Sequence, residues 1–349
     1  MANIAINGFG RIGRSFFKLA LTRPELNIVA INDLGDPENL AYLLRFDSAY
    51  GRYDQSVVVE SEGNSKFLVV GDQRIMFLQE KDGTKLPWKA LDVDIVVEAT
   101  GAFEGFNKSR FHIEAGAKRV VLTAPAKDDD TKDAKTVLVG VNQEVLKTCT
   151  LSSNGSCTTN SASPIIQILA EELGVKKAIL NSVHGYTATQ NLIDGPTSAK
   201  ATAGKPADWR RGRAAAANIS PSTTGAAIAV TRAIPELKDK FDGIAIRVPV
   251  LTGSLSVTTL VLKKKTTVDE LNTILEKAAK EDRWQGIFTT TREQLVSTDI
   301  IGDPHAAIAD LSLTKVVDGD LCSVYSWYDN EFGYTNSLVE HVIKVVAFL

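Results

Sequence analysis

The segment Ser156-Cys157-Thr158-Thr159-Asn160 carries the residue types best suited to chemistry in this chain. The thiol stands where an irregular polar stretch gives way to a predicted helix, whose apolar side chains run from Ile165 to Leu169. Backbone N–H groups at the start of a helix stabilise negative charge and so favour the thiolate form of a cysteine. Hydroxyls on both sides of the thiol can bind an anion. Taken alone, the segment is equally compatible with a nucleophile and with a structural cysteine.

The search for a base that could activate this thiol is short, because the chain has only four histidines. His184 follows a strand predicted at 178–183 and precedes a hydroxyl-rich run. A cysteine on one element with a histidine on another is the usual arrangement of an activated thiol. His305, in a predicted turn, is the second candidate, whereas His112 falls in a predicted surface helix and His341 in the predicted C-terminal helix. We therefore expect His184 to be the catalytic base rather than a structural histidine.

Arginines and hydroxyls form a third group of candidate residues. Three arginines within 210–213 precede the run Ser222-Thr223-Thr224-Gly225, and Arg247 interrupts an apolar strand predicted at 244–251. Guanidinium groups beside hydroxyls and a glycine backbone make good phosphate sites. Solvated charge with an interface salt bridge would explain the arginine run adequately, but it explains an arginine inside an apolar strand less well. We therefore expect an anion site here.

A glycine turn near the N-terminus predicts a cofactor site. Gly8-Phe9-Gly10-Arg11-Ile12-Gly13 follows a short apolar strand at 4–6 and opens a helix, which is the context that a pyrophosphate-binding turn requires. Asp33 ends the second predicted strand 20 residues after Gly13, where a carboxylate would bind the adenine ribose and repel a 2′-phosphate. Thr100 and Thr123 also follow predicted strands, at the edge where cofactors bind. A glycine turn needed only for packing is the alternative, but the context favours NAD.

The elements that position these residues change character along the chain. Short apolar strands alternate with helical segments over the first 150 residues, including a helix capped by Asp36, which predicts a mostly parallel sheet with helices on its faces. After Gly174 the strands are longer, and Thr267 and Glu270 form a predicted capping box for a helix. The expected fold is a Rossmann-type α/β dinucleotide-binding domain followed by an α+β domain with a mostly antiparallel or mixed sheet.

Composition limits the classes of function. With 349 residues, 44% hydrophobic and 23% charged, the chain is long enough for two globular domains. A net charge of −3 gives no reason to expect nucleic acid as the main partner, and we find no membrane-spanning run and no signal peptide. The three cysteines show no metal-binding spacing, which predicts free thiols, no metal site and a cytoplasmic location.

Taken together, these segments resemble the phosphorylating glyceraldehyde-3-phosphate dehydrogenases over essentially the whole chain. The motifs that carry the resemblance are Asn7 to Arg14, Asn32-Asp33, Ser156 to Asn160, His184 to Gln190, Arg213 to Asn218, Thr223 to Ala227, Arg247-Val248-Pro249 and Ser326 to Glu331. The resemblance implies an NAD-binding domain at 1–156, completed by a C-terminal helix at 335–349, and a catalytic domain at 157–334 with a long loop at 190–222. It also implies a cytoplasmic homotetramer acting in glycolysis or gluconeogenesis.

The same resemblance implies a mechanism and a set of site residues. Cys157 would attack the aldehyde of glyceraldehyde 3-phosphate, His184 would act as base while hydride leaves for NAD, and inorganic phosphate would cleave the thioester to give 1,3-bisphosphoglycerate. The backbone N–H of Cys157 would help to hold the oxyanion. Residues expected at the two phosphate sites are Ser156, Thr158, Thr187, Arg211, Thr224, Gly225 and Arg247. Residues expected at the cofactor are Gly8, Gly10, Arg11, Ile12, Gly13, Asp33, Lys81, Thr100, Thr123 and Asn330.

Some positions depart from the family pattern. The loop at 196–208 is longer than in most members, Ser161 stands where many have a second cysteine, and Phe332 replaces a common tryptophan.

The sequence also leaves three alternative functions. An erythrose 4-phosphate dehydrogenase that hydrolyses its thioester is one of them, and the phosphate-site residues disfavour it. An aspartate-semialdehyde dehydrogenase is expected to use NADPH, which Asp33 disfavours. A binding protein that retains the fold is a third alternative, disfavoured by the complete catalytic set.

Overall fold

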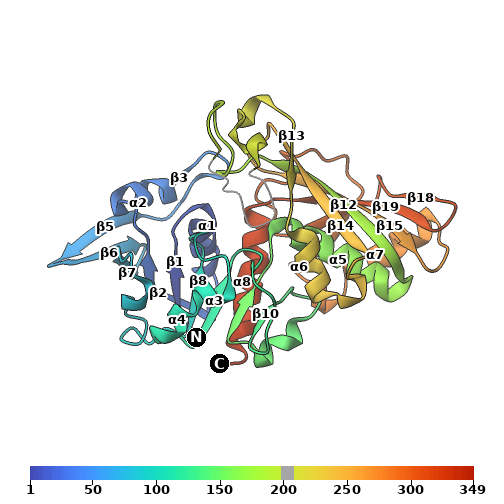
Figure 1. Cartoon of the computed structure of the whole chain (residues 1–349). Helices are drawn as coiled ribbons and strands as arrows, with labels where there is room; N and C mark the ends of the chain where they lie inside the picture. Colours follow the sequence, from blue (N-terminus) through green and yellow to red (C-terminus); the bar gives the residue numbers. More distant parts are fainter. Residues whose placement is uncertain (198–207) are drawn as a thin grey trace. The chain divides into compact units, whose positions relative to one another are not determined.

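The computed structural model of the chain describes residues 1–197 and 208–349, which form two compact units (Figure 1). Unit 1 consists of Met1–Gly155 together with Thr335–Leu349, and unit 2 consists of Ser156–Tyr334. The predicted loop at 190–222 belongs to unit 2. Most of its longer stretch, at 196–208, lies outside the described residues.

Unit 1 is built on a nine-stranded sheet with the strand order β10-β11-β9-β8-β1-β2-β7-β6-β5. Pairing is parallel from β10 to β7, whereas β5, β6 and β7 pair antiparallel at one edge, which confirms the predicted mostly parallel sheet. The central strands are buried on both faces and are therefore short apolar runs without alternation. The strands of unit 1 are β1 (Ala2–Asn7), β2 (Leu26–Asn32), β5 (Val57–Glu62), β6 (Ser65–Val70), β7 (Gln73–Leu78), β8 (Ile95–Glu98), β9 (Arg119–Leu122), β10 (Ala134–Thr136), β11 (Leu151–Ser153) and a separate pair, β3 (Phe46–Asp47) and β4 (Gly51–Arg52).

Helices cover this sheet and close its core. The C-terminal helix belongs to that core, because Leu338 and Val342 are buried in one cluster with Ile4 and Ile6 of β1. The predicted cap at Asp36 is confirmed, since its side chain accepts a hydrogen bond from the N–H of Asn39. The helices are α1 (Arg11–Ala20), α2 (Pro37–Arg45), α3 (Phe106–Ser109), α4 (Phe111–Glu114) and α8 (Phe332–Val346), with 3-10 turns η1 (Gly83–Lys85) and η2 (Gln143–Thr148).

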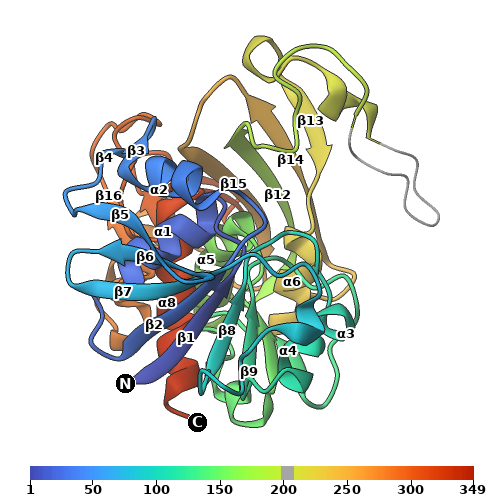
Figure 2. The ribbon, with the colours of Figure 1, turned by 90° about the vertical axis from the view of Figure 1, so that its left-hand side faces the viewer.

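Unit 2 contains a mixed eight-stranded sheet with the order β13-β14-β12-β15-β19-β17-β16, in which β18 pairs with β19. Its long strands β12, β14 and β15 lie side by side in Figure 2. Pairing is parallel between β12 and β14 and antiparallel between β12 and β15, which confirms the predicted mixed sheet. The strands are β12 (Val175–Gly185), β13 (Ser220–Thr223), β14 (Phe241–Val248), β15 (Ser254–Leu262), β16 (Phe288–Thr291), β17 (Ala307–Asp310), β18 (Lys315–Val317) and β19 (Leu321–Tyr328).

Three α-helices pack in unit 2, and one of them starts at the predicted nucleophile. Among the described residues, no helix combines the length and apolar character needed to cross a bilayer. The helices are α5 (Cys157–Glu172), α6 (Ala226–Ala233) and α7 (Val268–Ala278), with 3-10 turns η3 (Trp209–Gly212), η4 (Ala215–Ala217), η5 (Pro235–Leu237) and η6 (Asp282–Trp284).

Two local expectations are wrong. His112 lies in α4 but is fully buried, because its Nδ1 accepts a hydrogen bond from Trp88 and its Nε2 bonds to Glu98. The predicted capping box of α7 forms only in part. The hydroxyl of Thr267 accepts from the N–H of Glu270, but the Glu270 carboxylate accepts from the Thr266 hydroxyl at 2.9 Å instead of reaching back to the cap.

Candidate active site

Helix α5 holds Cys157 at its first position, which confirms the predicted strand-to-helix context of the thiol. Ser156 is the N-cap residue, and its hydroxyl accepts a hydrogen bond from the N–H of Thr159 at 3.1 Å. The Thr159 hydroxyl accepts in return from the N–H of Ser156 at 3.1 Å, which completes a capping box. The thiol therefore sits on a well-capped helix and not on a loose loop.

Cys157 and His184 are hydrogen-bonding neighbours. The Sγ atom of Cys157 lies 3.3 Å from Nε2 of His184, which is near the end of β12 and is 2% exposed. The Nδ1 atom of His184 lies 2.6 Å from the carbonyl oxygen of Gly185. The same Nδ1 also lies 2.5 Å from Nη1 of Arg247, which can only donate, whereas the carbonyl can only accept, so these two contacts do not fix the tautomer. With the proton on Nδ1, the lone pair of Nε2 faces the thiol. In that tautomer the imidazole can take the proton of Cys157.

Arg247 lies against the same imidazole. It pairs with His184 across β12 and β14, and its Nη1 is 2.5 Å from Nδ1 of His184. Burial, and then the charge of Arg247, lower the pKa of His184, so the ring is held neutral as a base must be. Burial also raises the pKa of the Cys157 thiol and outweighs the opposing effects of Arg247 and the helix start. The expected bias of the helix start toward a thiolate is thus present but is smaller than the effect of burial.

Arg211 brings a second guanidinium group near Arg247. Burial lowers the pKa of Arg247, and repulsion by Arg211 adds to that shift. Arg211 itself pairs with Asp208 at 3.4 Å and lies 3.4 Å from the hydroxyl of Ser222. Two cations that repel each other beside a buried imidazole favour the binding of an anion, since an anion relieves the repulsion between Arg247 and Arg211. The structure therefore brings Cys157, His184, Arg247 and Arg211 into one group.

Three of the expected phosphate residues lie on loops of the same unit. The Thr187 hydroxyl bonds to that of Thr189 at 2.9 Å, and the Thr224 hydroxyl accepts from the N–H of Ala226 at 3.2 Å. Gly225 is the N-cap residue of α6, so backbone N–H groups of a helix start lie beside Thr224. Across the described part of the chain, none of these three expected residues hydrogen-bonds to Cys157, His184 or Arg247.

The hydroxyls that flank the thiol are already engaged within the protein. Ser156 caps α5, as described above, and the hydroxyl of Thr158 lies 3.0 Å from the hydroxyl of Tyr328. Thr158 is 4% exposed, which places it below the surface of the site. The expected phosphate contacts of these two hydroxyls therefore require them to share or exchange their present partners.

The glycine turn of unit 1 fits a dinucleotide. Gly8 has a φ of +98°, and a Cβ atom on Gly13 would lie 2.1 Å from the carbonyl oxygen of Gly8, so both positions need glycine. Gly10 has no heavy atom within 4 Å of the place where a Cβ would be, which leaves its backbone open to a ligand at the start of α1. These three glycines match the roles of turn, close approach and helix packing in a pyrophosphate site.

Asp33 lies where a ribose-binding carboxylate is expected, at the end of β2. Its Oδ2 accepts from the N–H of Phe9 at 2.6 Å and its Oδ1 accepts from the N–H of Gly35 at 2.8 Å. The carboxylate is thereby fixed next to the glycine turn. Each oxygen keeps a second lone pair, which two ribose hydroxyls could use.

The other expected cofactor residues are placed as follows. In unit 1, Arg11 forms a two-bond ion pair with Asp47, and the Thr123 hydroxyl donates to the carbonyl oxygen of Glu98 at 3.0 Å. Ile12 lies in α1 and Lys81 is exposed after β7. In unit 2, the side-chain oxygen of Asn330 accepts from Gly253, Thr252 and Ser254, so its amide group is firmly oriented.

Sequence reasoning missed two residues that support these sites. Tyr328 bonds to Thr158 and to Ser182, and its ring lies edge-on to that of His184 with centroids 5.9 Å apart. Tyr328 belongs to the motif Ser326 to Glu331, in which the sequence pattern gives no indication of its contact with the base. Glu98 is a buried carboxylate at the end of an apolar strand, and an acidic residue in such a run is the signal that could have identified it.

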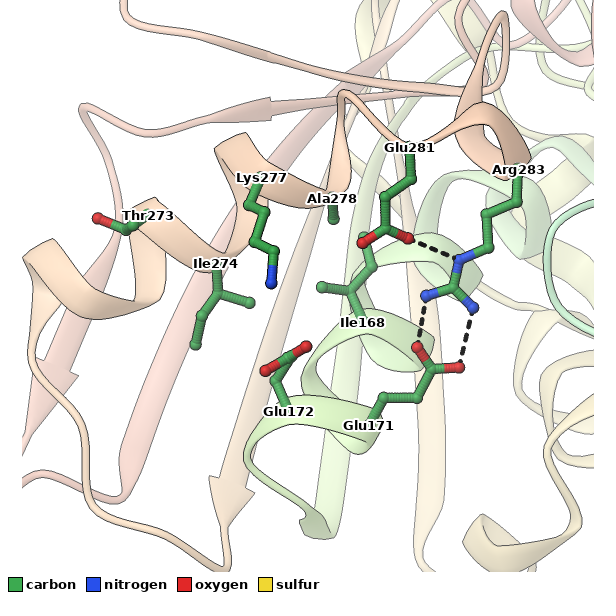
Figure 3. A pocket seen from close by; sticks show the side chains of 9 residues that line it. All are labelled: Ile168, Glu171, Glu172, Thr273, Ile274, Lys277, Ala278, Glu281 and Arg283. Carbon is green, nitrogen blue, oxygen red and sulfur yellow. Dashed lines mark hydrogen bonds and ion pairs between the residues drawn. The ribbon is translucent and has the colours of Figure 1, made fainter.

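A pocket at the opposite end of α5 is separate from this chemistry. It lies between α5 and α7, and Arg283 there forms a two-bond ion pair with Glu171 and contacts Glu281 (Figure 3). None of the expected site residues lines it. In the part of the chain that the structure describes, no three histidine, cysteine or acidic side chains gather as a metal site would require.

A dinucleotide turn on a parallel sheet in one unit, and a cysteine–histidine pair beside arginines in the other, define the class of aldehyde dehydrogenases that work through a cysteine and a nicotinamide cofactor. Residues 2–105 match the family described as glyceraldehyde 3-phosphate dehydrogenase, NAD binding domain, and residues 156–330 match its C-terminal domain. The chain belongs to the glyceraldehyde-3-phosphate dehydrogenase family.

Curated relatives agree with this assignment. The chain is 44% identical over 346 residues to the glyceraldehyde-3-phosphate dehydrogenase of Mycobacterium leprae, covering 97% of each protein. It is 43% identical over 350 residues to that of Mycolicibacterium smegmatis, covering 98% of each, and 43% identical over 343 residues to that of Clostridium pasteurianum, covering 97% of each. The sequence-based predictions of family, two-domain fold class, NAD as cofactor and an NAD-dependent oxidoreductase are thereby confirmed.

Proposed function

We propose that this protein catalyses the NAD-dependent, phosphorylating oxidation of glyceraldehyde 3-phosphate to 1,3-bisphosphoglycerate. The observation that carries this proposal is the contact of 3.3 Å between the Cys157 sulfur and Nε2 of His184, with Arg247 at the same imidazole. A thiol with a neutral base beside it and cations around it suits covalent attack on an aldehyde that carries a phosphate. Relatives that bear this activity in their names match nearly the whole chain.

In the first half of the reaction the Cys157 sulfur forms a bond to the aldehyde carbon, and the thiol proton passes to Nε2 of His184. The aldehyde oxygen gains negative charge, which the backbone N–H of Cys157 at the start of α5 can stabilise, and it then takes the proton from His184, which becomes neutral again. His184 then takes the proton of the resulting thiohemiacetal hydroxyl as the carbon gives up hydride, which leaves a thioester on Cys157. NAD, when bound, supplies the acceptor of that hydride.

In the second half inorganic phosphate attacks the thioester carbon and the Cys157 sulfur leaves as a thiolate, which gives the acyl phosphate. The proton held by His184 returns to the sulfur, so the thiol and the neutral base are both restored. Arg247 and Arg211 are proposed to hold phosphate groups, because Arg247 contacts the base and the charge of Arg211 acts on Arg247. Ser156, Thr158, Thr187, Thr224 and Gly225 are proposed to complete the two phosphate sites. Gly8, Gly10, Arg11, Ile12, Gly13, Asp33, Lys81, Thr100, Thr123 and Asn330 are proposed to bind NAD.

The dependence on phosphate tests this function. We expect NADH formation from glyceraldehyde 3-phosphate and NAD to need inorganic phosphate, or arsenate as a substitute, and to be at least tenfold slower without either. The same assay with NADP in place of NAD should be far slower, because Asp33 would oppose a 2′-phosphate. Equal rates with and without phosphate would refute the phosphorylating reaction and favour hydrolysis of the thioester.

We also propose that the protein is a homotetramer. One face of the unit 2 sheet is buried under helices, with Leu180 and Leu260 both fully buried. Among residues of the opposite face, Ile179 is 54% exposed and Ile244 is 45% exposed on adjacent strands. Exposed apolar side chains gathered on one sheet face support a subunit interface. Light scattering coupled to gel filtration should give a mass four times that of the 37.7 kDa chain, and a monomer mass would refute the proposal.

The remaining proposals concern domains and location. We propose that residues 1–156 with 335–349 form the NAD-binding domain, that 157–334 form the catalytic domain, and that the protein acts in the cytoplasm. The two compact units, Met1–Gly155 with Thr335–Leu349 and Ser156–Tyr334, support these boundaries. Three free cysteines support a reducing compartment. Limited proteolysis should cut first at the junctions between the two domains, and an earlier cut inside either domain would count against the boundaries. Recovery of the protein outside the cytoplasmic fraction would count against the proposed location.

A further inference from the structure

A buried carboxylate, Glu98, lies beneath the cofactor edge of the unit 1 sheet. It ends β8, is 4% exposed, and stands in register with Asn7 of β1, which stands in register with Asn32 of β2. The Nδ2 group of Asn32 donates to Oδ1 of Asn7 at 2.8 Å, and the Nδ2 group of Asn7 donates to Oε2 of Glu98 at 2.6 Å. Three polar side chains thus form a ladder across neighbouring strands at one level of the sheet.

The protein itself supplies four hydrogen bonds to Glu98. Oε1 accepts from the N–H of Thr100 at 2.9 Å and from its hydroxyl at 2.5 Å, while Oε2 accepts from Asn7 and from Nε2 of His112, the latter at 3.0 Å. The indole N–H of Trp88 can only donate, and it donates to Nδ1 of His112 at 2.9 Å. His112 must therefore carry its proton on Nε2 and donate it to Glu98. Each carboxylate oxygen of Glu98 thus accepts two hydrogen bonds from the protein. We therefore do not expect Glu98 itself to bind the cofactor.

Each group of the ladder adjoins a segment expected to bind NAD. Asn7 precedes Gly8, and Asn32 precedes Asp33. Asn32 also fixes Glu80, whose N–H donates to Oδ1 of Asn32 at 2.9 Å and which precedes Lys81. The position of Gly8 depends on Thr100 as well, because a Cβ on Gly8 would lie 2.5 Å from the backbone nitrogen of Thr100. Finally, Thr123 donates to the carbonyl oxygen of Glu98 through both its N–H and its hydroxyl.

We propose that Glu98 is a positioning residue for the dinucleotide site, which holds the glycine turn, the Asp33 turn, the Thr100 turn and Thr123 in one fixed arrangement through its contacts with Asn7, Thr100 and His112. The proposal rests on NAD as the cofactor but not on the identity of the aldehyde. A residue in this role sets the affinity for NAD without touching it, because it removes the conformational freedom that binding would otherwise have to restrict. It has no part in the thiol chemistry of unit 2.

The test is Glu98→Gln, which keeps the size of the side chain but offers one acceptor oxygen in place of two. Whichever way the amide lies, its NH₂ group faces donors, either those of Thr100 or those of Asn7 and His112. We expect the dissociation constant for NAD, measured by titration calorimetry on the purified protein, to rise at least tenfold. KM for NAD should rise in parallel, while the rate at which iodoacetamide alkylates Cys157 without NAD should stay within twofold of wild type.

Two further variants keep the proposal open to refutation. Asp310→Asn changes a buried carboxylate of unit 2 that accepts from Ser312 and Trp327, and it should lower stability while leaving the NAD dissociation constant within twofold. His112→Leu removes one donor to Glu98 and should weaken NAD binding three- to tenfold, which provides the test if Glu98→Gln does not fold. A folded Glu98 or His112 variant that binds NAD as tightly as wild type overturns the positioning role. A wild-type protein that binds no NAD overturns the cofactor assignment instead.

Discussion

The proposed chemistry depends most on one residue, the base His184. It is buried between a thiol on one side and a guanidinium on the other, and both burial and Arg247 lower its pKa. A neutral imidazole that faces a thiol is prepared to accept a proton during attack on a carbonyl. An anion bound to Arg247 would offset the positive charge near the ring, so the strength of the base is linked to occupation of the phosphate site.

Replacing this base gives a direct prediction. His184→Asn removes the proton acceptor and should lower kcat by about 10²- to 10⁴-fold, while the dissociation constant for NAD stays within twofold of wild type. Steady-state kinetics and calorimetry measure the two quantities.

The matched control is His305→Asn, which changes the second candidate base, a half-buried histidine that pairs with Asp303 at 2.8 Å. Its kcat should remain within about threefold of wild type. If the His305 variant loses more activity than the His184 variant, the assignment of the base is wrong.

The structural settings of the candidate catalytic residues could be predicted from the sequence, but their protonation could not. A cysteine at a predicted helix start and a histidine at a predicted strand end are local patterns, and α5 and β12 confirm both. The pKa values of these side chains depend on how deeply the fold buries them and on which charge the sheet register places alongside. Arg247 meets His184 only because β14 pairs with β12, a contact between residues 63 positions apart.

At the scale of elements, parallel strands and caps could be predicted because their signals are short-range. Asp36 caps α2 as its spacing with Pro37 indicates, and the short apolar runs of the first half form a parallel sheet. His112 shows the limit of such short-range signals, since the sequence pattern predicts a surface helix and the side chain is fully buried. Its burial follows from Trp88 and Glu98, which reach it from other elements and satisfy both of its ring nitrogens.

The capping boxes illustrate the same limit on a smaller scale. In α5 the box forms between Ser156 and Thr159, and in α7 the carboxylate of Glu270 turns to the neighbouring Thr266. Both sequences permit a reciprocal cap. The local partner that is closest decides which hydrogen bond forms, and a threonine immediately before the cap offers an alternative that the motif does not include.

At the scale of the whole molecule, the C-terminal helix α8 is tied into unit 1 by a buried polar network. His341 on this helix is fully buried, with Nε2 at 2.8 Å from the Ser152 hydroxyl and Nδ1 at 3.1 Å from Oδ1 of Asn154. Asn154 in turn donates to the Ser337 hydroxyl at 3.1 Å. The chain's last helix is therefore joined to β11 and to the segment that leads toward the nucleophile.

This network makes stability depend on pH. Burial lowers the pKa of His341 to about 4, whereas an unfolded histidine titrates near 6.5. Between these values the unfolded chain binds a proton that the folded chain does not, so the free energy of unfolding falls as the pH is lowered through this window. From pH 7 to pH 5 the loss due to His341 should be about 2 kcal/mol. Carboxylates with lowered pKa values, such as Asp133, lose their contribution only below about pH 4.

The variant His341→Gln isolates this effect, because glutamine can keep hydrogen bonds to the same partners and does not titrate. Urea unfolding at fixed protein concentration, followed by circular dichroism, should show a fall in unfolding free energy between pH 7 and pH 5 that is about 2 kcal/mol smaller for the variant than for wild type. His184, whose pKa is also lowered, contributes equally to both proteins and cancels in the comparison. Parallel pH profiles for the two proteins would mean that His341 gains a proton without unfolding of α8, and that the buried network admits a charge.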